Sequence, residues 1–274
     1  MSRVDLHAHT TASDGELTPR ELVELAAKRG VTVLGVTDHD TTEGVPAALE
    51  AGQSLDVSVV PGIELNTDTE DGHLDILGYF IDINNRDLQD VLFKIRDVRY
   101  YRAKRMVEKL SELGLPISFD RVLELSVEGS VGRPHVAQAL LEAGHVSSVS
   151  EAFDLYIGRN GPAYADRYRL TPEKACALVR QAGGVPSMAH PVPASDPFSD
   201  PHNLAELLPA LREAGLGALE CYYPGYTPAV SAWLRELSAR FDLIPTGGSD
   251  FHGAPKPDIE LGMVDVPLEC VERL

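Results

Sequence analysis

Near the start of the chain, the stretch VDLHAHTTASDGELTP (residues 4–19) places His7 and His9 directly after a short apolar run, with Asp14 five residues further on. Imidazole and carboxylate groups without thiolate favour zinc, manganese or iron, and magnesium is also compatible with them. Taken alone, the histidine pair is ambiguous, because side chains at i and i+2 share a face only while a strand continues. The ends of the other predicted strands decide between a metal site and a polar N-terminus of no consequence.

Polar residues that can bind metal follow several apolar runs along the chain. Run 3–6 is followed by His7 and His9, run 33–37 by Asp38 and His39, run 59–63 by Glu64, run 185–189 by His190, run 216–219 by Glu220, and run 243–246 by Ser249, Asp250 and His252. In a parallel β/α barrel these positions lie on one face, at the C-terminal ends of the strands, where such barrels place their active sites. The regularity therefore predicts a single shared site.

The candidate ligands are too many for one metal ion. The connection after Glu64 is too short for a crossover helix, so the next strand is predicted to return antiparallel and to bring Asp75, or less favourably His73, to the same rim. The other candidates are His7, His9, Asp14, His39, Glu64, His190, Asp250 and His252. Two or three divalent ions bridged by Glu64 or Asp250 fit this set better than one tetrahedral site. Such clusters suit attack on phosphorus by an ion-bound hydroxide while other ions hold the phosphoryl oxygens.

The elements that position these residues alternate between short apolar strands and amphipathic helices. In LTPRELVELAAKRG (residues 17–30), Thr18 is the predicted N-cap, Glu21 completes a capping box, and Gly30 suits the end of the helix. No convincing strand occurs between about residues 86 and 160, and the alternation then resumes. We therefore expect an α/β barrel of residues 1–85 and 161–274, with a helical insertion, residues 86–160, covering the mouth of the active site.

Composition limits the partners of the chain. Its 274 residues carry a formal net charge of −18, from 42 acidic and 24 basic residues. Such a surface repels long polyanions, so we expect no long nucleic acid as partner. A small anionic substrate can still bind where cationic side chains or metal ions make the local electrostatic potential positive. No apolar stretch is long enough to span a bilayer, and Cys176, Cys221 and Cys270 have neither disulfide nor zinc-site spacing. We expect a soluble, cytoplasmic protein with buried free thiols, and we predict no membrane or protein partner.

Five motifs occur in order: DLHAHTTASDG, GVTDHD, PGIEL, MAHP and GSDFHG. Together they resemble the PHP (polymerase and histidinol phosphatase) family of metal-dependent phosphoesterases, from Val4 to about Gly253. The resemblance implies a distorted (β/α)7 TIM-like barrel, the PHP fold, with a di- or trinuclear metal centre. Carried over residue by residue, it implies one ion on His7, His9, Glu64 and Asp250, a second on Glu64 and His190, and a third on Asp14, His39 and His252.

One position departs from the family pattern. The family usually carries a histidine three residues before the glycine of DILGY, and here that position is Asp75. Either Asp75 replaces the imidazole with a harder, anionic ligand, or the second ion is weakly held or absent. His73 is the less favoured substitute. The number of ions, two or three, is therefore open.

The insertion motif GRPHVAQAL (residues 132–140) resembles the branch of the family that acts on nucleoside 3′,5′-bisphosphates and on the ends of short RNA. Physically, Arg133 and His135 at a helix start combine a guanidinium, an imidazole, free backbone N–H groups and the helix dipole into a phosphate clamp. The structural alternative is an ion pair of Arg133 and a helix cap by His135. In ECYYPGYT (residues 220–227), tyrosines such as Tyr223 either stack on a base or pack in the core or rim.

We therefore expect a metal-dependent phosphoesterase. The expected catalytic residues are His7, His9, Asp14, His39, Glu64, Asp250 and His252, with Asp75 and His190 as further metal ligands and Arg133 and His135 as phosphate-binding residues. The expected substrate is a phosphomonoester of a small nucleotide, foremost a nucleoside 3′,5′-bisphosphate and also short RNA ends. Leaving-group protonation is open between His135 and a metal-bound water. Alternatives are a cyclic-nucleotide or other phosphodiesterase, a histidinol-phosphate phosphatase, hydrolysis of a C–N bond, and a non-catalytic metal-binding domain.

Overall fold

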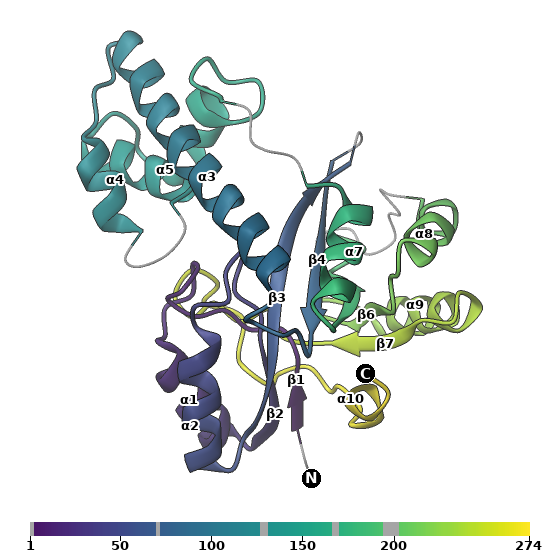
Figure 1. Ribbon diagram of the computed structural model, residues 1–274. Coiled ribbons are helices and arrows are strands. Elements are labelled where there is room, and N and C mark those ends of the chain that lie inside the picture. Colours follow the sequence, from purple (N-terminus) through teal and green to yellow (C-terminus); the bar gives the residue numbers. More distant parts are fainter. Residues whose placement is uncertain (1–2, 70–71, 127–130, 166–169, 194–202) are drawn as a thin grey trace. The chain divides into compact units, whose positions relative to one another are not determined.

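The computed structural model describes residues 3–69, 72–126, 131–165, 170–193 and 203–274 (Figure 1). For residues 96 and 97 it describes the backbone alone. In these ranges the strands are β1 Arg3–Asp5, β2 Val31–Val36, β3 Ser58–Asp68, β4 His73–Tyr79, β5 Val185–Met188, β6 Ala218–Tyr222 and β7 Ile244–Gly247. The helices are α1 Pro19–Arg29, α2 Val45–Leu55, α3 Arg86–Glu112, α4 Phe119–Leu125, α5 Arg133–Glu142, α6 Val149–Ala152, the π-helix η1 Phe153–Ile157, α7 Pro172–Gln181, α8 Leu204–Glu213, α9 Pro228–Arg240 and α10 Glu269–Glu272.

The chain divides into two compact units. The first comprises residues 1–89 and 169–274 and contains all the strands named above. The second comprises residues 90–168 and is helical in its described part. Each unit has a core of its own, and that of the second includes Met106, Leu110, Val122 and Leu140. No described helix is long and apolar enough to cross a membrane.

In the described part of the chain, seven strands form one sheet in the order β1-β2-β3-β4-β5-β6-β7. Neighbouring strands are parallel except at β4, which runs antiparallel to both β3 and β5. The short link from Asp68 to His73 allows only a tight turn, so β4 returns along β3 as a hairpin. The predicted antiparallel return is confirmed, and it distorts an otherwise parallel arrangement.

Residues just beyond β1 and β7 close the sheet into a barrel. The Leu6 N–H donates to the Gly247 carbonyl over 3.2 Å. One step further, the Asp250 N–H donates to the His7 carbonyl over 2.8 Å. Gly248 permits this approach, because a Cβ there would lie 2.4 Å from the His7 backbone nitrogen. Closure of seven strands in this mixed α/β unit confirms the predicted fold class.

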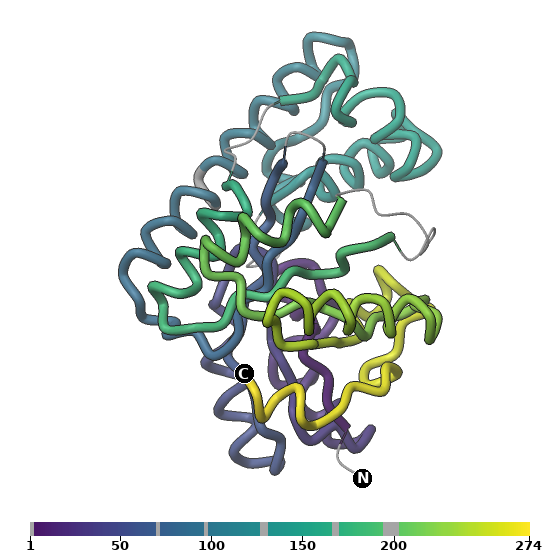
Figure 2. The backbone as a smooth tube through the Cα atoms, turned by 90° about the vertical axis from the view of Figure 1, so that its right-hand side faces the viewer, coloured from purple at the N-terminus to yellow at the C-terminus, as the bar shows by residue number. Residues whose placement is uncertain are grey.

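Helices cover the outside of the barrel strands. Figure 1 shows α1 and α2 beside β2 on one side, and Figure 2 shows α7, α8 and α9 on the side turned toward the viewer. The start of α1 follows the prediction, since the Glu21 N–H donates to Thr18 Oγ1 (3.3 Å) and the Thr18 N–H donates to Glu21 Oε2 (2.9 Å). Gly30 ends this helix with a φ of 73°, which favours glycine. The chain then enters β2, whose end carries His39 toward the barrel rim.

The cysteines behave as predicted. Cys176, Cys221 and Cys270 are free thiols and all three are buried. Burial raises the pKa of the Cys176 and Cys221 thiols to about 12. They are therefore structural side chains with little thiolate character near neutral pH.

Candidate metal centre

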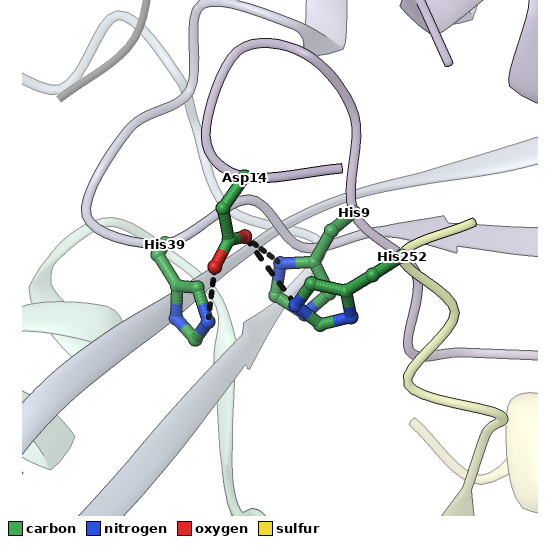
Figure 3. A group of neighbouring side chains, drawn as sticks. All are labelled: His9, Asp14, His39 and His252. Carbon is green, nitrogen blue, oxygen red and sulfur yellow. Dashed lines mark ion pairs between the residues drawn. The ribbon is translucent and has the colours of Figure 1, made fainter. Parts of the chain in front are cut away.

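Among the described residues, the imidazoles and carboxylates predicted from the sequence gather in three overlapping groups. Within each group, one potential ligand atom per residue lies within 4.8 Å of all the others. The groups are His7, His9, Glu64 and Asp250; Glu64, Asp75 and His190; and His9, Asp14, His39 and His252. Figure 3 shows the last group, in which the Asp14 carboxylate points toward the three imidazole rings. His9 and Glu64 each belong to two groups and link the three into one centre.

The Glu64 carboxylate lies at the middle of this centre. Its Oε2 is 3.3 Å from His7 Nε2, and 3.2 Å from His9 Nε2. The same oxygen is 3.1 Å from His39 Nδ1, whereas Oε1 is 3.1 Å from His190 Nε2. The Glu64 side chain is 1% exposed. A buried carboxylate with its two oxygens directed to different imidazoles suits a bridging ligand.

The donor atoms of the first group fit a metal ion. His7 Nε2 and His9 Nε2 lie 3.2–3.5 Å from Glu64 Oε2 and Asp250 Oδ1. Ligands about 2.1 Å from a tetrahedral ion are separated by about 3.4 Å, which matches these distances. Within the described residues, His7 Nε2, both ring nitrogens of His9 and Glu64 Oε2 are buried without a hydrogen-bond partner. Because buried polar atoms are otherwise almost always paired, their convergence indicates a cation site.

The electrostatics of the centre couple its imidazoles to its carboxylates. Burial acts to lower the pKa of His9, but the Asp250 and Glu64 carboxylates outweigh it and raise this pKa to about 9. Burial likewise opposes a raised pKa at His190, yet Glu64 and Asp75 bring it to about 9. Burial would raise the pKa of Glu64, but the nearby imidazoles hold it well below its usual range. At His9 and His190 the centre therefore stabilises positive charge, which metal ions would supply in place of protons, whereas burial lowers the pKa of His39 to about 4.

Backbone conformation at two strand ends is unusual. Asp250 has a φ of 55° and His190 a φ of 26°, both in the left-handed region that non-glycine residues rarely adopt. Such strain costs on the order of 1–3 kcal/mol and persists where surrounding contacts enforce it. The contacts here are the hydrogen bond from the Asp250 N–H to the His7 carbonyl and that from the His190 N–H to Glu220 Oε2 (2.7 Å). The strained turns place both side chains in the centre.

Glu220 orients two of the predicted ligands; the sequence placed it at a strand end on the shared rim but not among the candidate ligands. Its Oε1 lies 3.1 Å from His7 Nδ1, on the ring side opposite the metal group. Its Oε2 accepts the N–H of His190. A carboxylate on the second ring nitrogen fixes the tautomer and orientation of a ligating histidine. The signal available in the sequence was its place directly after run 216–219.

Asp38 has a similar supporting role for the loop that carries Asp14. It accepts hydrogen bonds from the Thr10 N–H (2.7 Å), the Thr10 hydroxyl (2.8 Å) and the Ser13 hydroxyl (2.7 Å). The loop is thereby held in place just before Asp14. Asp14 itself is 41% exposed, so this end of the centre is open to solvent.

The departure from the family pattern at Asp75 falls in the second group. Asp75 Oδ2 lies 3.9 Å from His190 Nε2, within the group that contains Glu64. His73 instead lies 2.6 Å from Asp68, and its side chain is 58% exposed. The geometry favours Asp75 over His73 as the third potential ligand.

Two residues of the predicted phosphate clamp, Arg133 and His135, belong to the second unit. His135 Nδ1 accepts a hydrogen bond from the Gly132 N–H over 3.0 Å, so this imidazole caps the start of α5. The Arg133 guanidinium lies 5.5 Å from the centre of the Phe153 ring. The structural alternative for His135 is thus present in the fold, and the phosphate-binding role of both residues stays a prediction.

Two further residues contact Asp250 and were not predicted to do so. The Tyr223 hydroxyl donates to Asp250 Oδ2 over 2.7 Å, and its ring lies 5.6 Å from that of His190. Lys256 Nζ lies 2.5 Å from the same oxygen. Lys256 follows β7 in an irregular segment, where no periodicity or strand end could reveal it.

A family model described as PHP domain matches residues 5–157, which is more than half of the 274-residue chain. Three curated relatives are similar over nearly the whole chain. The chain is 34% identical to the 5′-3′ exoribonuclease Rnm of Salmonella typhimurium over 260 residues, covering 94% of this chain and 87% of the relative. It is 34% identical over 254 residues to the phosphoribosyl 1,2-cyclic phosphate 1,2-diphosphodiesterase of Eggerthella lenta (91% and 94% covered). It is 28% identical over 273 residues to the 3′,5′-nucleoside bisphosphate phosphatase of Chromobacterium violaceum (98% and 94% covered).

A solved structure supports the same assignment. The crystal structure described as that of a metal-dependent phosphoesterase from Bifidobacterium adolescentis matches with a TM-score of 0.86 and 34% identity, covering 99% of this chain and 94% of that one. The matching family model, these relatives and the three groups of potential metal ligands agree. The chain therefore belongs to the PHP family and is a metal-dependent phosphoesterase.

Proposed function

We propose that this phosphoesterase hydrolyses a phosphomonoester at the end of a small nucleotide, with a nucleoside 3′,5′-bisphosphate as its foremost substrate. The observation that carries the proposal is the linking of three groups of potential metal ligands through the shared residues Glu64 and His9. A centre with several ions can hold more than one phosphoryl oxygen during in-line attack. The similarity to a nucleoside bisphosphate phosphatase over 98% of the chain supports the substrate class.

In this proposal the side chains of the barrel rim hold two or three ions of manganese, zinc or iron. When bound, such ions supply Lewis-acid chemistry: they activate water and neutralise charge on phosphoryl oxygens. His7, His9 and Glu64 are buried, which strengthens the electrostatic interactions that the centre offers to a reacting phosphate. Glu220 keeps the His7 ring oriented. The more exposed Asp14 leaves the end of the centre accessible to a substrate.

Arg133 and His135 keep their proposed role in binding a substrate phosphate. A guanidinium binds phosphate with paired N–H donors, which a neutral side chain of similar length lacks. We expect Arg133→Met to raise KM for a nucleotide substrate more than it lowers kcat. An equal loss of thermal stability and activity, with KM unchanged, would instead assign Arg133 to packing against Phe153.

A second candidate is stepwise hydrolysis of short RNA from its 5′ end, a phosphodiester reaction. The similarity to a 5′-3′ exoribonuclease, at 34% identity over 94% of the chain, favours it. The same metal groups can serve both reactions, since attack on phosphorus is common to them. The net charge of −18 argues that any RNA substrate is short.

A substrate panel separates these reactions. Chelator-treated protein reloaded with manganese is incubated with adenosine 3′,5′-bisphosphate, with a short 5′-phosphorylated oligoribonucleotide and with a ribose cyclic phosphate diester. Inorganic phosphate and released nucleotides are then quantified. Fast phosphate release from the bisphosphate supports the foremost proposal, whereas release of mononucleotides from RNA with little free phosphate supports the second. Inactivity of the metal-loaded protein on all nucleotide substrates refutes both.

A matched pair of variants controls for contaminating phosphatases. Asp250→Asn removes a charge within the first metal group and is expected to abolish turnover. Asp258→Asn changes an exposed carboxylate in the same C-terminal segment and is expected to leave turnover unchanged. Equal activity of the two variants would mean that the measured hydrolysis does not come from this centre.

A further inference from the structure

The two oxygens of Asp250 have different surroundings. Oδ1 faces the first metal group, 3.5 Å from His7 Nε2 and 3.3 Å from His9 Nε2. Oδ2 faces the other way and contacts the Tyr223 hydroxyl (2.7 Å) and Lys256 Nζ (2.5 Å). An ammonium group therefore contacts the same carboxylate whose other oxygen would hold a metal ion.

The positive charge of Lys256 repels metal ions at the neighbouring ligand groups, so by itself it disfavours metal binding. The three groups contain four carboxylates, from Asp14, Glu64, Asp75 and Asp250. Two divalent ions balance these carboxylates, and a third leaves the centre positively charged, because ligating imidazoles are neutral. Lys256 adds a further positive charge at short range. With Glu220 beside His7 counted as a fifth carboxylate, two divalent ions and Lys256 are balanced, whereas a third ion leaves net positive charge that a bound phosphate can offset.

The Lys256 side chain can also reach a bound phosphate and donate hydrogen bonds to it. Its side chain is 39% exposed, so its ammonium group can meet a ligand from solvent. An ammonium group carries three N–H donors, of which the contact with Asp250 uses one. The remaining donors can interact with the oxygens of a phosphate bound next to Asp250.

Asp250 does not depend on Lys256 for its orientation. The Tyr223 hydroxyl donates to the same Oδ2 atom, and Tyr223 packs against His190 and Tyr226 at ring-centre distances of 5.6 and 5.3 Å. A neutral replacement of Lys256 therefore leaves the carboxylate held by one hydrogen bond. Loss of the lysine would then remove a charge without removing the ligand.

We propose that Lys256 is a substrate-binding residue that contacts a non-bridging oxygen of the phosphoryl group held at the metal centre. The inference rests on the proposed phosphomonoester chemistry and assigns the ligand class as a phosphate dianion. Its two consequences have opposite signs. Removing the ammonium charge weakens phosphate binding, whereas it leaves metal binding equal or tighter.

The test measures both binding equilibria without substrate turnover. Inorganic phosphate is titrated calorimetrically into manganese-loaded full-length protein, and manganese is titrated into chelator-treated protein, for wild type, Lys256→Met, Lys256→Gln and Lys256→Arg. The matched control is Lys28→Met, an equal charge change at an exposed lysine in the last turn of α1. Thermal melting confirms that each variant is folded.

We expect about tenfold weaker phosphate binding in both neutral variants, recovery of most of this loss in Lys256→Arg, and no change in Lys28→Met. Manganese affinity should stay equal or rise in the neutral variants. Phosphate affinity within twofold of wild type would overturn the proposal, as would a parallel loss of manganese affinity, which would make Lys256 a support for Asp250. Because the probe is inorganic phosphate, the binding result can be interpreted even if the substrate panel identifies no nucleotide substrate.

Discussion

Replacing Glu220 with glutamine tests whether one carboxylate orients ligands of two metal groups. His7 Nε2 faces Glu64 and its Nδ1 lies 3.1 Å from Glu220 Oε1, so a metal ion on Nε2 would leave the Nδ1–H to donate to Glu220. The His190 N–H donates to Oε2 (2.7 Å). Glutamine offers one acceptor oxygen and an NH2 group, so in Glu220→Gln one of the two buried donors loses its acceptor. An unsatisfied buried donor costs about 1–3 kcal/mol.

Both stability and metal binding should therefore change. The cost of about 1–3 kcal/mol corresponds to a melting temperature roughly 2–12 °C lower for a unit of this size. Loss of a carboxylate behind a ligating histidine typically weakens metal binding about 10–100-fold. Differential scanning calorimetry and competition with a chelator of known affinity measure the two effects. The control is Glu213→Gln, an exposed glutamate of α8, which should match wild type in both assays. Manganese affinity of Glu220→Gln within twofold of wild type would refute the orienting role.

Three further predictions concern the same unit. Asp75→Ala should lower the number of bound ions per chain while His73→Ala leaves it unchanged, as measured by elemental analysis after dialysis; equal effects would contradict the assignment of Asp75 to the second group. The pKa values of His9 and His190 are raised to about 9, so both rings should carry protons at pH 7.5 in metal-free protein. Metal binding to chelator-treated protein should therefore release protons and become tighter between pH 7 and 9. Calorimetry in buffers of different ionisation enthalpy measures the proton release, and pH-independent binding would contradict the prediction. The three buried thiols should not react with a thiol reagent at pH 8 until the protein is unfolded; rapid labelling of the native protein would show that the core around them opens.

Much of the barrel was predictable because its signals are local. Apolar runs, helix caps and polar strand ends lie within a few residues of one another, so Thr18, Glu21 and Gly30 predicted the first helix with its capping box. The short link after β3 predicted the hairpin. Strand lengths were less accurate, since β3 extends over Ser58–Asp68 while the apolar run covers only its first half. Pairing with β4 continues the strand through polar residues, which no hydrophobic pattern marks.

The supporting residues of the centre depend on contacts between distant parts of the chain. Glu220 and His7 are far apart in sequence and meet only when the barrel closes. Lys256 reaches Asp250 from an irregular segment, so neither periodicity nor a strand end indicated it. His135 shows the opposite case, where the sequence offered two roles and the fold displays the helix cap. Local patterns thus identify potential ligands, whereas the groups that orient them follow from tertiary structure.

The number of metal ions per chain, measured in wild type and Glu64→Gln, tests the central claim most directly. Glu64 belongs to two of the three groups, so its carboxylate should be needed for both. We predict at least two ions per chain in wild-type protein by elemental analysis, and at most one in Glu64→Gln, held by the group around Asp14. One ion or fewer in wild type, or a ratio that Glu64→Gln leaves unchanged, would contradict a multinuclear centre joined through Glu64.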